Sequence, residues 1–137
     1  MLLHKPLPLT KNSVFFIADD DPDDQEIFVK ALKEIDELCT CIITSDGKKA
    51  VEELLLLQPP LPDMIFLDLN MPLMNGRQCL MEIKKHTRLQ HIPVIIYSTT
   101  DNEKEMQEAL DLGAALFLRK PNRFDELCRS LQRIIQV

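Results

Sequence analysis

Five short hydrophobic runs recur along the chain, and segments with a helical spacing of apolar residues separate them. The runs are almost continuously apolar, which is typical of strands that are covered on both faces of a sheet. The first run, SVFFIA, is also rich in residues that favour strands. We therefore predict strands at 13–18, 41–44, 63–68, 93–98 and 115–120.

The segments between the strands carry recognisable helix signals. Asp21 followed by Pro22 predicts the start of the first helix, because aspartate is a preferred cap and proline is favoured in the first turn. Thr100 and Glu103 have the spacing of a capping box and predict the start of another helix, which ends at Gly113. The remaining helices are predicted at 47–57, at 78–86 and from Phe124 nearly to Val137.

Strands and helices thus alternate along the whole chain, which predicts an α/β fold with a doubly wound parallel sheet and helices on both faces. A length of 137 residues suits one domain. We assign residues 13–137 to this domain. Residues 1–12 contain proline and lysine but no strand or helix pattern, and we expect them to form a flexible lead-in.

Composition narrows the classes of function. The net charge is −6 and the basic residues do not cluster, which argues against nucleic acid or an anionic membrane as partner. The longest aliphatic run, 54–57, is far too short to span a membrane, and the first ten residues lack a signal-peptide pattern. The four cysteines match no zinc or redox motif. We therefore expect a cytoplasmic protein with reduced thiols.

Polar residues follow the predicted strands at their carboxyl ends, where ligands bind in such sheets. Carboxylates that converge there repel one another, and a divalent cation would remove that conflict. Because the candidate ligands are oxygen atoms, the cation is expected to be Mg²⁺, or Mn²⁺ in its place. The residues at the strand ends are Asp19, Asp20, Asp21, Asp68, Asn70, Ser98 and Lys120.

The same set could carry out phosphoryl transfer. A carboxylate can act as a nucleophile toward phosphorus and form an aspartyl phosphate. Such a transfer depends chiefly on positioning and on neutralisation of charge. Mg²⁺, the Lys120 ammonium group and the Ser98 hydroxyl could each take one phosphoryl oxygen.

Over residues 13–135 the sequence resembles a response-regulator receiver domain of two-component signalling. The matching pieces are Asp19-Asp20 after the first strand, DLNMPLMNG around Asp68, Ser98 after the fourth strand and Lys120-Pro121 after the fifth. The chain is most similar to stand-alone receivers, including those that serve bacterial phytochromes, whose acidic cluster often continues into a proline as in DDDPDD. The resemblance implies a flavodoxin-like sheet with strand order 2-1-3-4-5.

The resemblance also implies roles for the acidic residues. Asp68 would accept the phosphoryl group. Asp20 and Asp68 would bind Mg²⁺ directly, the backbone carbonyl of Asn70 would be the third protein ligand, and Asp19 would act through water. Three consecutive acids leave the register ambiguous by one residue, and we place the pair at Asp19-Asp20 because Asp21 is needed to open the helix. Asp21, Asp23 and Asp24 are then interpreted as charges at a helix N-terminus.

By the same resemblance, Ser98 and Lys120 would contact the phosphoryl group, and Ser98 with Phe117 would form a switch. A histidine kinase or phosphotransfer protein would supply the phosphoryl group, and the phosphorylated form would change its contacts with a downstream protein. The resemblance allows a homodimer through the fourth helix, fifth strand and fifth helix. The chain would be a signalling domain rather than an enzyme, apart from self-dephosphorylation.

Two other classes remain open on sequence. A phosphohydrolase of the haloacid dehalogenase type also uses an aspartate after a strand, but it typically needs a second aspartate two residues later, where this chain has Asn70. The other class is a receiver-like interaction module that is never phosphorylated. The chain also departs from the usual receiver pattern, with Ser98 in place of the commoner threonine and Thr99 where many receivers have alanine or glycine.

Overall fold

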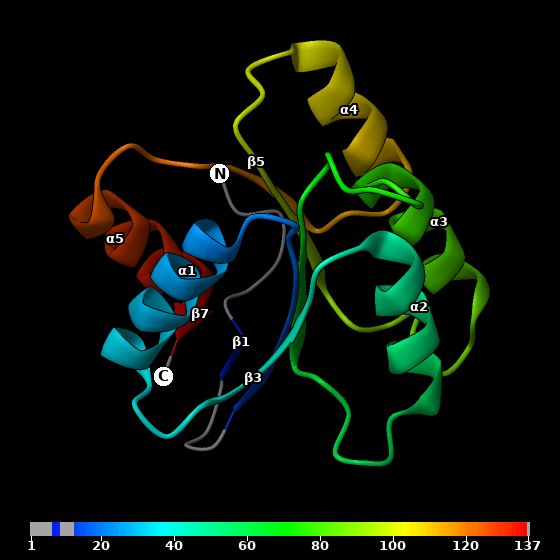
Figure 1. The fold of residues 1–137 in the computed structure, drawn as a ribbon, viewed down its shortest axis with the longest axis horizontal. Coiled ribbons are helices and arrows are strands. Elements are labelled where there is room, and N and C mark those ends of the chain that lie inside the picture. Colours follow the sequence, from blue (N-terminus) through cyan, green and yellow to red (C-terminus); the bar gives the residue numbers. More distant parts are fainter. Residues whose placement is uncertain (1–6, 9–12, 137) are drawn as a thin grey trace.

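A parallel sheet forms the centre of the molecule (Figure 1). The structure is a computed structural model that describes residues 7–8 and 13–136. Within these residues, five strands pair side by side in the order β3-β2-β4-β5-β6, and every neighbouring pair is parallel. Numbered among themselves, these strands have the predicted order 2-1-3-4-5, so the predicted fold class is confirmed. The strands are β2 (Val14–Ala18), β3 (Thr40–Thr44), β4 (Met64–Leu67), β5 (Val94–Ser98) and β6 (Leu116–Arg119).

Helices cover both faces of this sheet. Figure 1 shows α1 and α5 together on one face and α2, α3 and α4 on the other. Of the helices that the structure describes, none is both long and apolar enough to cross a membrane. The helices are α1 (Pro22–Ile35), α2 (Gly47–Leu56), α3 (Gly76–Lys85), α4 (Glu103–Asp111) and α5 (Phe124–Ile134).

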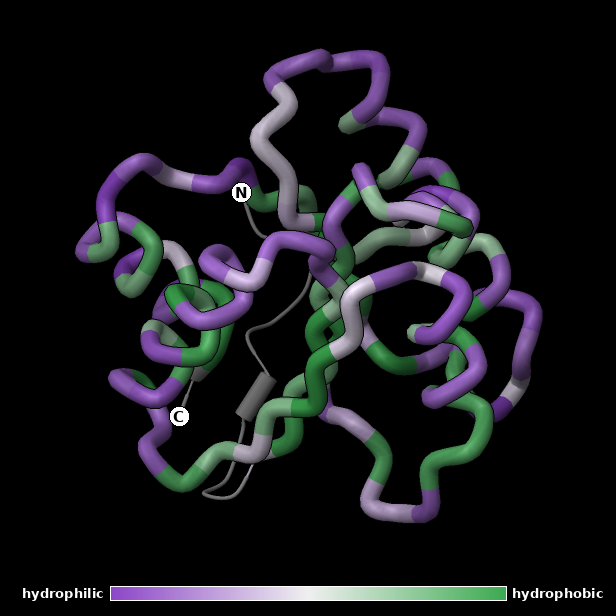
Figure 2. The backbone as a smooth tube through the Cα atoms, in the orientation of Figure 1, coloured by the Kyte–Doolittle hydropathy of each residue, from purple (hydrophilic) through white to green (hydrophobic). Residues whose placement is uncertain are grey.

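Hydrophobic side chains fill both interfaces between sheet and helices. Successive strand residues point to opposite faces, so Phe15 belongs to the cluster beneath α1 and α5, whereas Phe16 belongs to the cluster beneath α2, α3 and α4. In the first cluster the Phe28 ring lies 4.7 Å from the ring of Phe66 and 4.7 Å from that of Tyr97, between ring centroids. In Figure 2 the central strands are hydrophobic and the loops at the upper edge are hydrophilic. The four cysteines are free thiols, as predicted.

The helix starts follow side-chain caps, not all of them where the sequence predicted. Asp21 caps α1 by accepting from the backbone N–H groups of Asp23 and Asp24, and Pro22 is the first helical residue, which confirms that prediction. α3 begins at Gly76 rather than at residue 78, because Asn75 and Gln78 form a reciprocal capping box.

The capping box predicted at Thr100 and Glu103 is wrong. The cap of α4 is Asn102, whose side-chain oxygen accepts from the backbone N–H groups of Lys104 and Glu105. The Thr100 hydroxyl instead accepts from the backbone N–H of Asn102 at 3.2 Å. Thr100 therefore stabilises the turn that precedes the helix.

The ends of the domain meet in a second, two-stranded parallel sheet. β1 (Leu7–Pro8) pairs with β7 (Ile135–Gln136). The last helix, predicted to run nearly to Val137, ends at Ile134, because there the chain leaves α5 to pair with β1. Most of the predicted lead-in 1–12 lies outside the described residues, and the part inside them forms β1.

Candidate functional site

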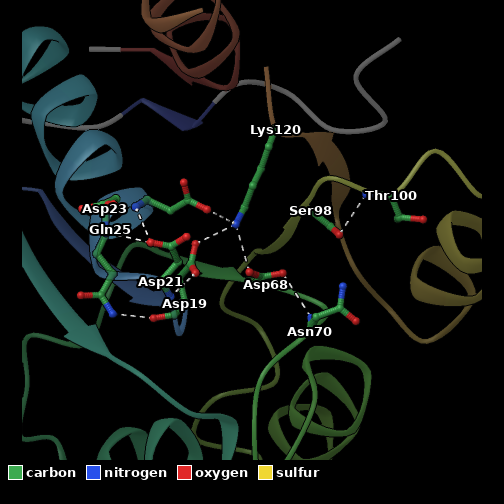
Figure 3. Close-up of polar contacts among 10 residues, drawn as sticks. Asp19, Asp21, Asp23, Gln25, Asp68, Asn70, Ser98, Thr100 and Lys120 are labelled. Carbon is green, nitrogen blue, oxygen red and sulfur yellow. Dashed lines mark hydrogen bonds and ion pairs between the residues drawn. The ribbon is translucent and has the colours of Figure 1, made fainter. Parts of the chain in front are cut away.

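The predicted polar residues meet at the carboxyl edge of the central sheet (Figure 3). Asp19 directly follows β2, Asp68 directly follows β4, Ser98 ends β5 and Lys120 directly follows β6. Parallel neighbouring strands place their carboxyl ends at one edge, which brings together residues that are far apart in sequence. Figure 3 shows Asp68 in the middle, with Asp19 on one side of it and Ser98 on the other.

Asp68 is buried, with 7% of its surface exposed, and both of its carboxylate oxygens have partners. Oδ1 accepts from the backbone N–H of Asn70 at 3.2 Å, and Oδ2 accepts from Nζ of Lys120 at 3.0 Å. The backbone N–H of Asp68 donates to the carbonyl of Ala18 at 2.9 Å, which extends the pairing of β4 with β2 by one residue. The apolar strand thus ends on a carboxylate because a lysine and a backbone N–H offset the cost of burying the charge.

The N-terminus of α3 packs closely on the backbone of Asp68. A Cβ atom added to Gly76 would lie 2.1 Å from the Asp68 carbonyl oxygen, far inside any normal contact distance. The backbone N–H of Gly76 donates to the carbonyl of Leu69 at 3.0 Å. The motif DLNMPLMNG therefore ends in glycine because α3 must begin against the residue that precedes the turn.

Asp19, Asp20 and Asp68 form an acidic cluster in which one carboxylate oxygen from each lies within 4.8 Å of the others. Asp19 and Asp68 are buried, whereas Asp20 is exposed. Ligand oxygens around one Mg²⁺ ion are separated by roughly 3–4 Å, since each lies about 2.1 Å from the ion. Small movements would let this set hold the cation, so the residues present fit a hard divalent ion such as Mg²⁺.

Without a cation, the buried negative charge of the acidic cluster is energetically unfavourable. Burial raises the pKa of Asp19 to about 6, although hydrogen bonds from the Asp21 backbone N–H and from Lys120 act in the opposite direction. Oδ1 of Asp19 accepts from Asp21 at 3.0 Å, and its Oδ2 accepts from Lys120 at 2.9 Å. A positive ion beside Asp19 would favour its charged form, which makes the cluster a cation-seeking site.

Lys120 lies among three carboxylates of the described residues. Its Nζ donates to Oδ2 of Asp24 at 2.8 Å, of Asp19 at 2.9 Å and of Asp68 at 3.0 Å. Burial disfavours the ammonium ion, but the hydrogen bonds to these carboxylates outweigh it and raise the pKa of Lys120 above its ordinary value. Nζ also lies 5.1 Å from the centre of the Tyr97 ring. Lys120 is therefore a fixed positive charge beside Asp68.

The sequence did not assign Asp24 and Tyr97 to the site. Asp24 lies in the first turn of α1 as predicted, but its carboxylate also pairs with Lys120. Its position in the first turn of the helix that directly follows the acidic residues after β2 could have indicated that it lies near the same edge. Tyr97 is buried on the α1–α5 side of β5, and a run of buried strand residues gave no signal that its ring lies against a lysine.

The other predicted residues occupy different places around this centre. Ser98 is fully buried, and its Oγ accepts from the backbone N–H of Thr100 at 3.3 Å. Asn70 is exposed and contacts Asp68 through its backbone N–H. Phe117 does not enter the polar site; it is partly buried against the cluster beneath α2, α3 and α4.

This fold and acidic site define a class of signalling domain. The sequence profile of the response regulator receiver domain matches residues 15–132, so the chain belongs to that family. Both the predicted resemblance and the predicted role in two-component signalling are confirmed. The family couples a sensor to a response, and phosphorylation of an aspartate is typical of it.

Similar proteins come from bacteria and from plants. The chain is 30% identical over 125 residues to the response regulator Rcp1 of Synechocystis. The matched region covers 88% of this chain and 85% of that protein. It is 31% identical over 119 residues to the two-component response regulator ORR5 of rice (Oryza sativa subsp. japonica), covering 87% and 86%.

Solved structures of relatives share the fold over most of their length. The crystal structure of the phosphorylated cyanobacterial phytochrome response regulator RcpA has a TM-score of 0.82 at 28% identity, covering 90% of this chain and 91% of that one. The Mn(2+)-bound form of Rcp1 has a TM-score of 0.77 at 31% identity, covering 89% and 91%.

Proposed function

We propose that Asp68 accepts a phosphoryl group from a histidine kinase or phosphotransfer protein, in a reaction that depends on Mg²⁺. The observation that carries this proposal is the position of the Asp68 carboxylate, which belongs to the acidic cluster and is bound to Lys120 at the same time. A nucleophile, a cation site and a fixed positive charge are the parts that phosphoryl transfer requires.

Each residue then has a separate task. When bound, Mg²⁺ would supply positive charge for the phosphoryl oxygens, held directly by Asp20, Asp68 and the Asn70 carbonyl and through water by Asp19. The Lys120 ammonium group, already 3.0 Å from Asp68, would pair with another phosphoryl oxygen. The buried Ser98 hydroxyl would donate to a third oxygen. The relatives named above support this assignment, since one was solved phosphorylated and another with Mn(2+) bound.

Mass spectrometry of the intact protein tests the acceptor. With acetyl phosphate and Mg²⁺ the wild type should gain the mass of one phosphoryl group, and EDTA should prevent the gain. Asp68→Asn should gain nothing, because an amide is not a nucleophile toward phosphorus. Asp101→Asn, which removes an exposed carboxylate near β5, is the matched control and should label like the wild type. Full labelling of Asp68→Asn would contradict the assignment, and an unlabelled wild type would favour the unphosphorylated interaction module.

The output of phosphorylation is proposed to be a change in protein contacts in the cytoplasm. Ser98 lies fully buried at the end of β5, and Phe117 lies on the neighbouring strand β6, half-buried toward α4. Movement of the Ser98 hydroxyl toward a phosphoryl oxygen would leave room for the aromatic ring, which gives two alternative positions. The face of α4, β6 and α5 would then bind a downstream protein or a second copy of the chain.

A double-mutant cycle tests this switch. Ser98→Ala and Phe117→Ala should each accept phosphate yet lose most of the gain in partner or dimer affinity, and their effects should not add. Undiminished coupling in both single variants would refute the switch while leaving Asp68 as acceptor. Because one relative is a phytochrome response regulator, a phytochrome-type kinase is the first candidate donor. Hydrolysis of the aspartyl phosphate by the domain itself would reset it.

A further inference from the structure

The ion pair between Asp24 and Lys120 is not explained by the need to cap α1. Asp21 already caps that helix by accepting from the backbone N–H groups of Asp23 and Asp24. The neighbouring acid Asp23 shows that a first-turn carboxylate needs no partner here: within the described part of the chain it makes no side-chain hydrogen bond or ion pair. Asp24 instead lies 2.8 Å from Nζ of Lys120, with 36% of its side chain exposed.

Asp24 differs from the other two partners of Lys120 in one respect. Asp19 and Asp68 belong to the acidic cluster that fits a divalent cation, whereas Asp24 does not. An ammonium group has three N–H donors, and the described carboxylates take all of them. When the oxygens of Asp19 and Asp68 turn to a cation, Lys120 loses hydrogen bonds and gains a positive neighbour. Asp24 is the partner that remains available to it.

We propose that Asp24 is a positioning residue that retains the Lys120 ammonium group beside the site while Asp19 and Asp68 are engaged by a divalent cation. Without Asp24, Lys120 would depend on Asp19 and Asp68 alone, and the cation would have to compete with the ammonium group for both carboxylates. Asp24 thus keeps the Lys120 ammonium group apart from the divalent cation, although both positive charges belong to the same site. This inference rests on the proposed Mg²⁺-dependent function and deepens it.

The groove beside this pair is consistent with such a role. It has a volume of about 530 Å³, runs between α1 and α5, and is lined by Asp24, Tyr97, Thr99 and Lys120 among others. The ammonium group therefore has room to move away from Asp19 and Asp68 while it keeps its hydrogen bond to Asp24. The side chain of Lys120 is only 9% exposed, so bulk water is a poor replacement for the carboxylates as its hydrogen-bond partner.

Calorimetric titration with Mg²⁺ tests the proposal directly, without phosphorylation. Asp24→Asn should weaken Mg²⁺ binding roughly five- to tenfold, which corresponds to the loss of about one charge-assisted hydrogen bond. Asp23→Asn removes the same charge from the same helix turn without touching Lys120, and should weaken binding less than about twofold. Equal effects of the two substitutions, or tighter binding by Asp24→Asn, would overturn the proposal.

A second pair of variants separates positioning from simple charge. In a Lys120→Met background the proposal predicts that Asp24→Asn has no larger effect on Mg²⁺ affinity than Asp23→Asn, because the group that Asp24 retains is gone. An effect of Asp24→Asn that persists in this background would show direct attraction of the cation and overturn the proposal. Thermal unfolding in EDTA verifies that each variant is folded.

Failure of the proposed function would look different. A wild type that binds no Mg²⁺ and accepts no phosphoryl group would refute the metal-dependent function itself, and this inference with it. A wild type that does both, with Asp24→Asn indistinguishable from Asp23→Asn, would refute only the role of Asp24.

Discussion

Replacing Asp19 by asparagine should make the metal-free protein more stable at neutral pH. Asp19 is 2% exposed, and burial raises the pKa of its carboxyl group from an ordinary value of 3.8 to about 6. At pH 7 that difference corresponds to roughly 3 kcal/mol by which the charged form destabilises the fold. Asparagine removes the charge, but its amide is a weaker partner for Lys120 than the carboxylate, so part of the gain in stability is lost. We expect the free energy of unfolding to rise by about 1–3 kcal/mol.

The dependence on pH identifies the cause. Because the pKa of Asp19 is higher in the folded than in the unfolded chain, the folded state takes up a proton as the pH falls from about 6 to 4, and this removes the destabilising contribution of the Asp19 charge. The free energy of unfolding of Asp19→Asn should therefore exceed that of the wild type by the full amount above about pH 7, and by almost nothing near pH 4.

Urea unfolding in EDTA, at several pH values, measures this effect. Asp101→Asn, at an exposed position, is the control and should change stability by less than about 0.5 kcal/mol. Addition of Mg²⁺ should stabilise the wild type more than Asp19→Asn, because the variant lacks one carboxylate of the cluster. A variant less stable than the wild type at pH 7 in EDTA, or an advantage that does not vary with pH, would refute the reasoning.

Two further substitutions test how the scaffold holds the site. Arg88→Ala should destabilise the fold by about 2–3 kcal/mol in urea unfolding, because its guanidinium donates to the carbonyls of Leu54, Leu55 and Leu57 at the end of α2. The control is Arg129→Ala, which breaks a surface ion pair and should cost less than about 1 kcal/mol. Equal losses of stability in the two variants would contradict this role of Arg88. Gly76→Ala should cost at least about 2 kcal/mol and slow labelling by acetyl phosphate, because its Cβ would displace the Asp68 carbonyl; wild-type stability and labelling would show that α3 can move away freely.

The fold was largely predictable because its signals are local. Buried parallel strands appear as continuous apolar runs, and Asp21-Pro22 opens α1 where a cap and a first-turn proline predict it. The strand order is not contained in such patterns; it followed from the resemblance to receivers. The pairing of β7 with β1 was not predicted, because it joins the two ends of the chain and no local pattern indicates it.

Capping shows how local signals compete. The spacing of Thr100 and Glu103 matches a capping box, yet Asn102 is nearer the first turn and its side chain reaches two backbone N–H groups. The true capping box lies at Asn75 and Gln78. Sequence spacing alone does not choose between such candidates, because the path of the preceding loop decides which side chain faces the helix end.

The candidate site was predicted as far as strand ends could predict it. Asp19, Asp68, Ser98 and Lys120 follow or end strands, so the topology of the sheet brings them together. Asp24 lies on a helix and meets Lys120 across 96 residues of sequence, a contact that depends on how α1 sits against the sheet. Because an acid in the first turn of a helix is favourable by itself, nothing in the sequence indicated that Asp24 also pairs with Lys120.

The position of Tyr97 has a practical consequence. It is the only tyrosine of a chain without tryptophan, so all tyrosine emission of the protein comes from one ring. That ring is buried against Phe28 and lies 5.1 Å from Nζ of Lys120. Burial raises its pKa, which keeps the phenol neutral and emissive well into alkaline solution. The single tyrosine is therefore an expected optical reporter: if a cation or a phosphoryl group moves Lys120, the surroundings of the Tyr97 ring should change, and its emission should follow binding in real time without a label.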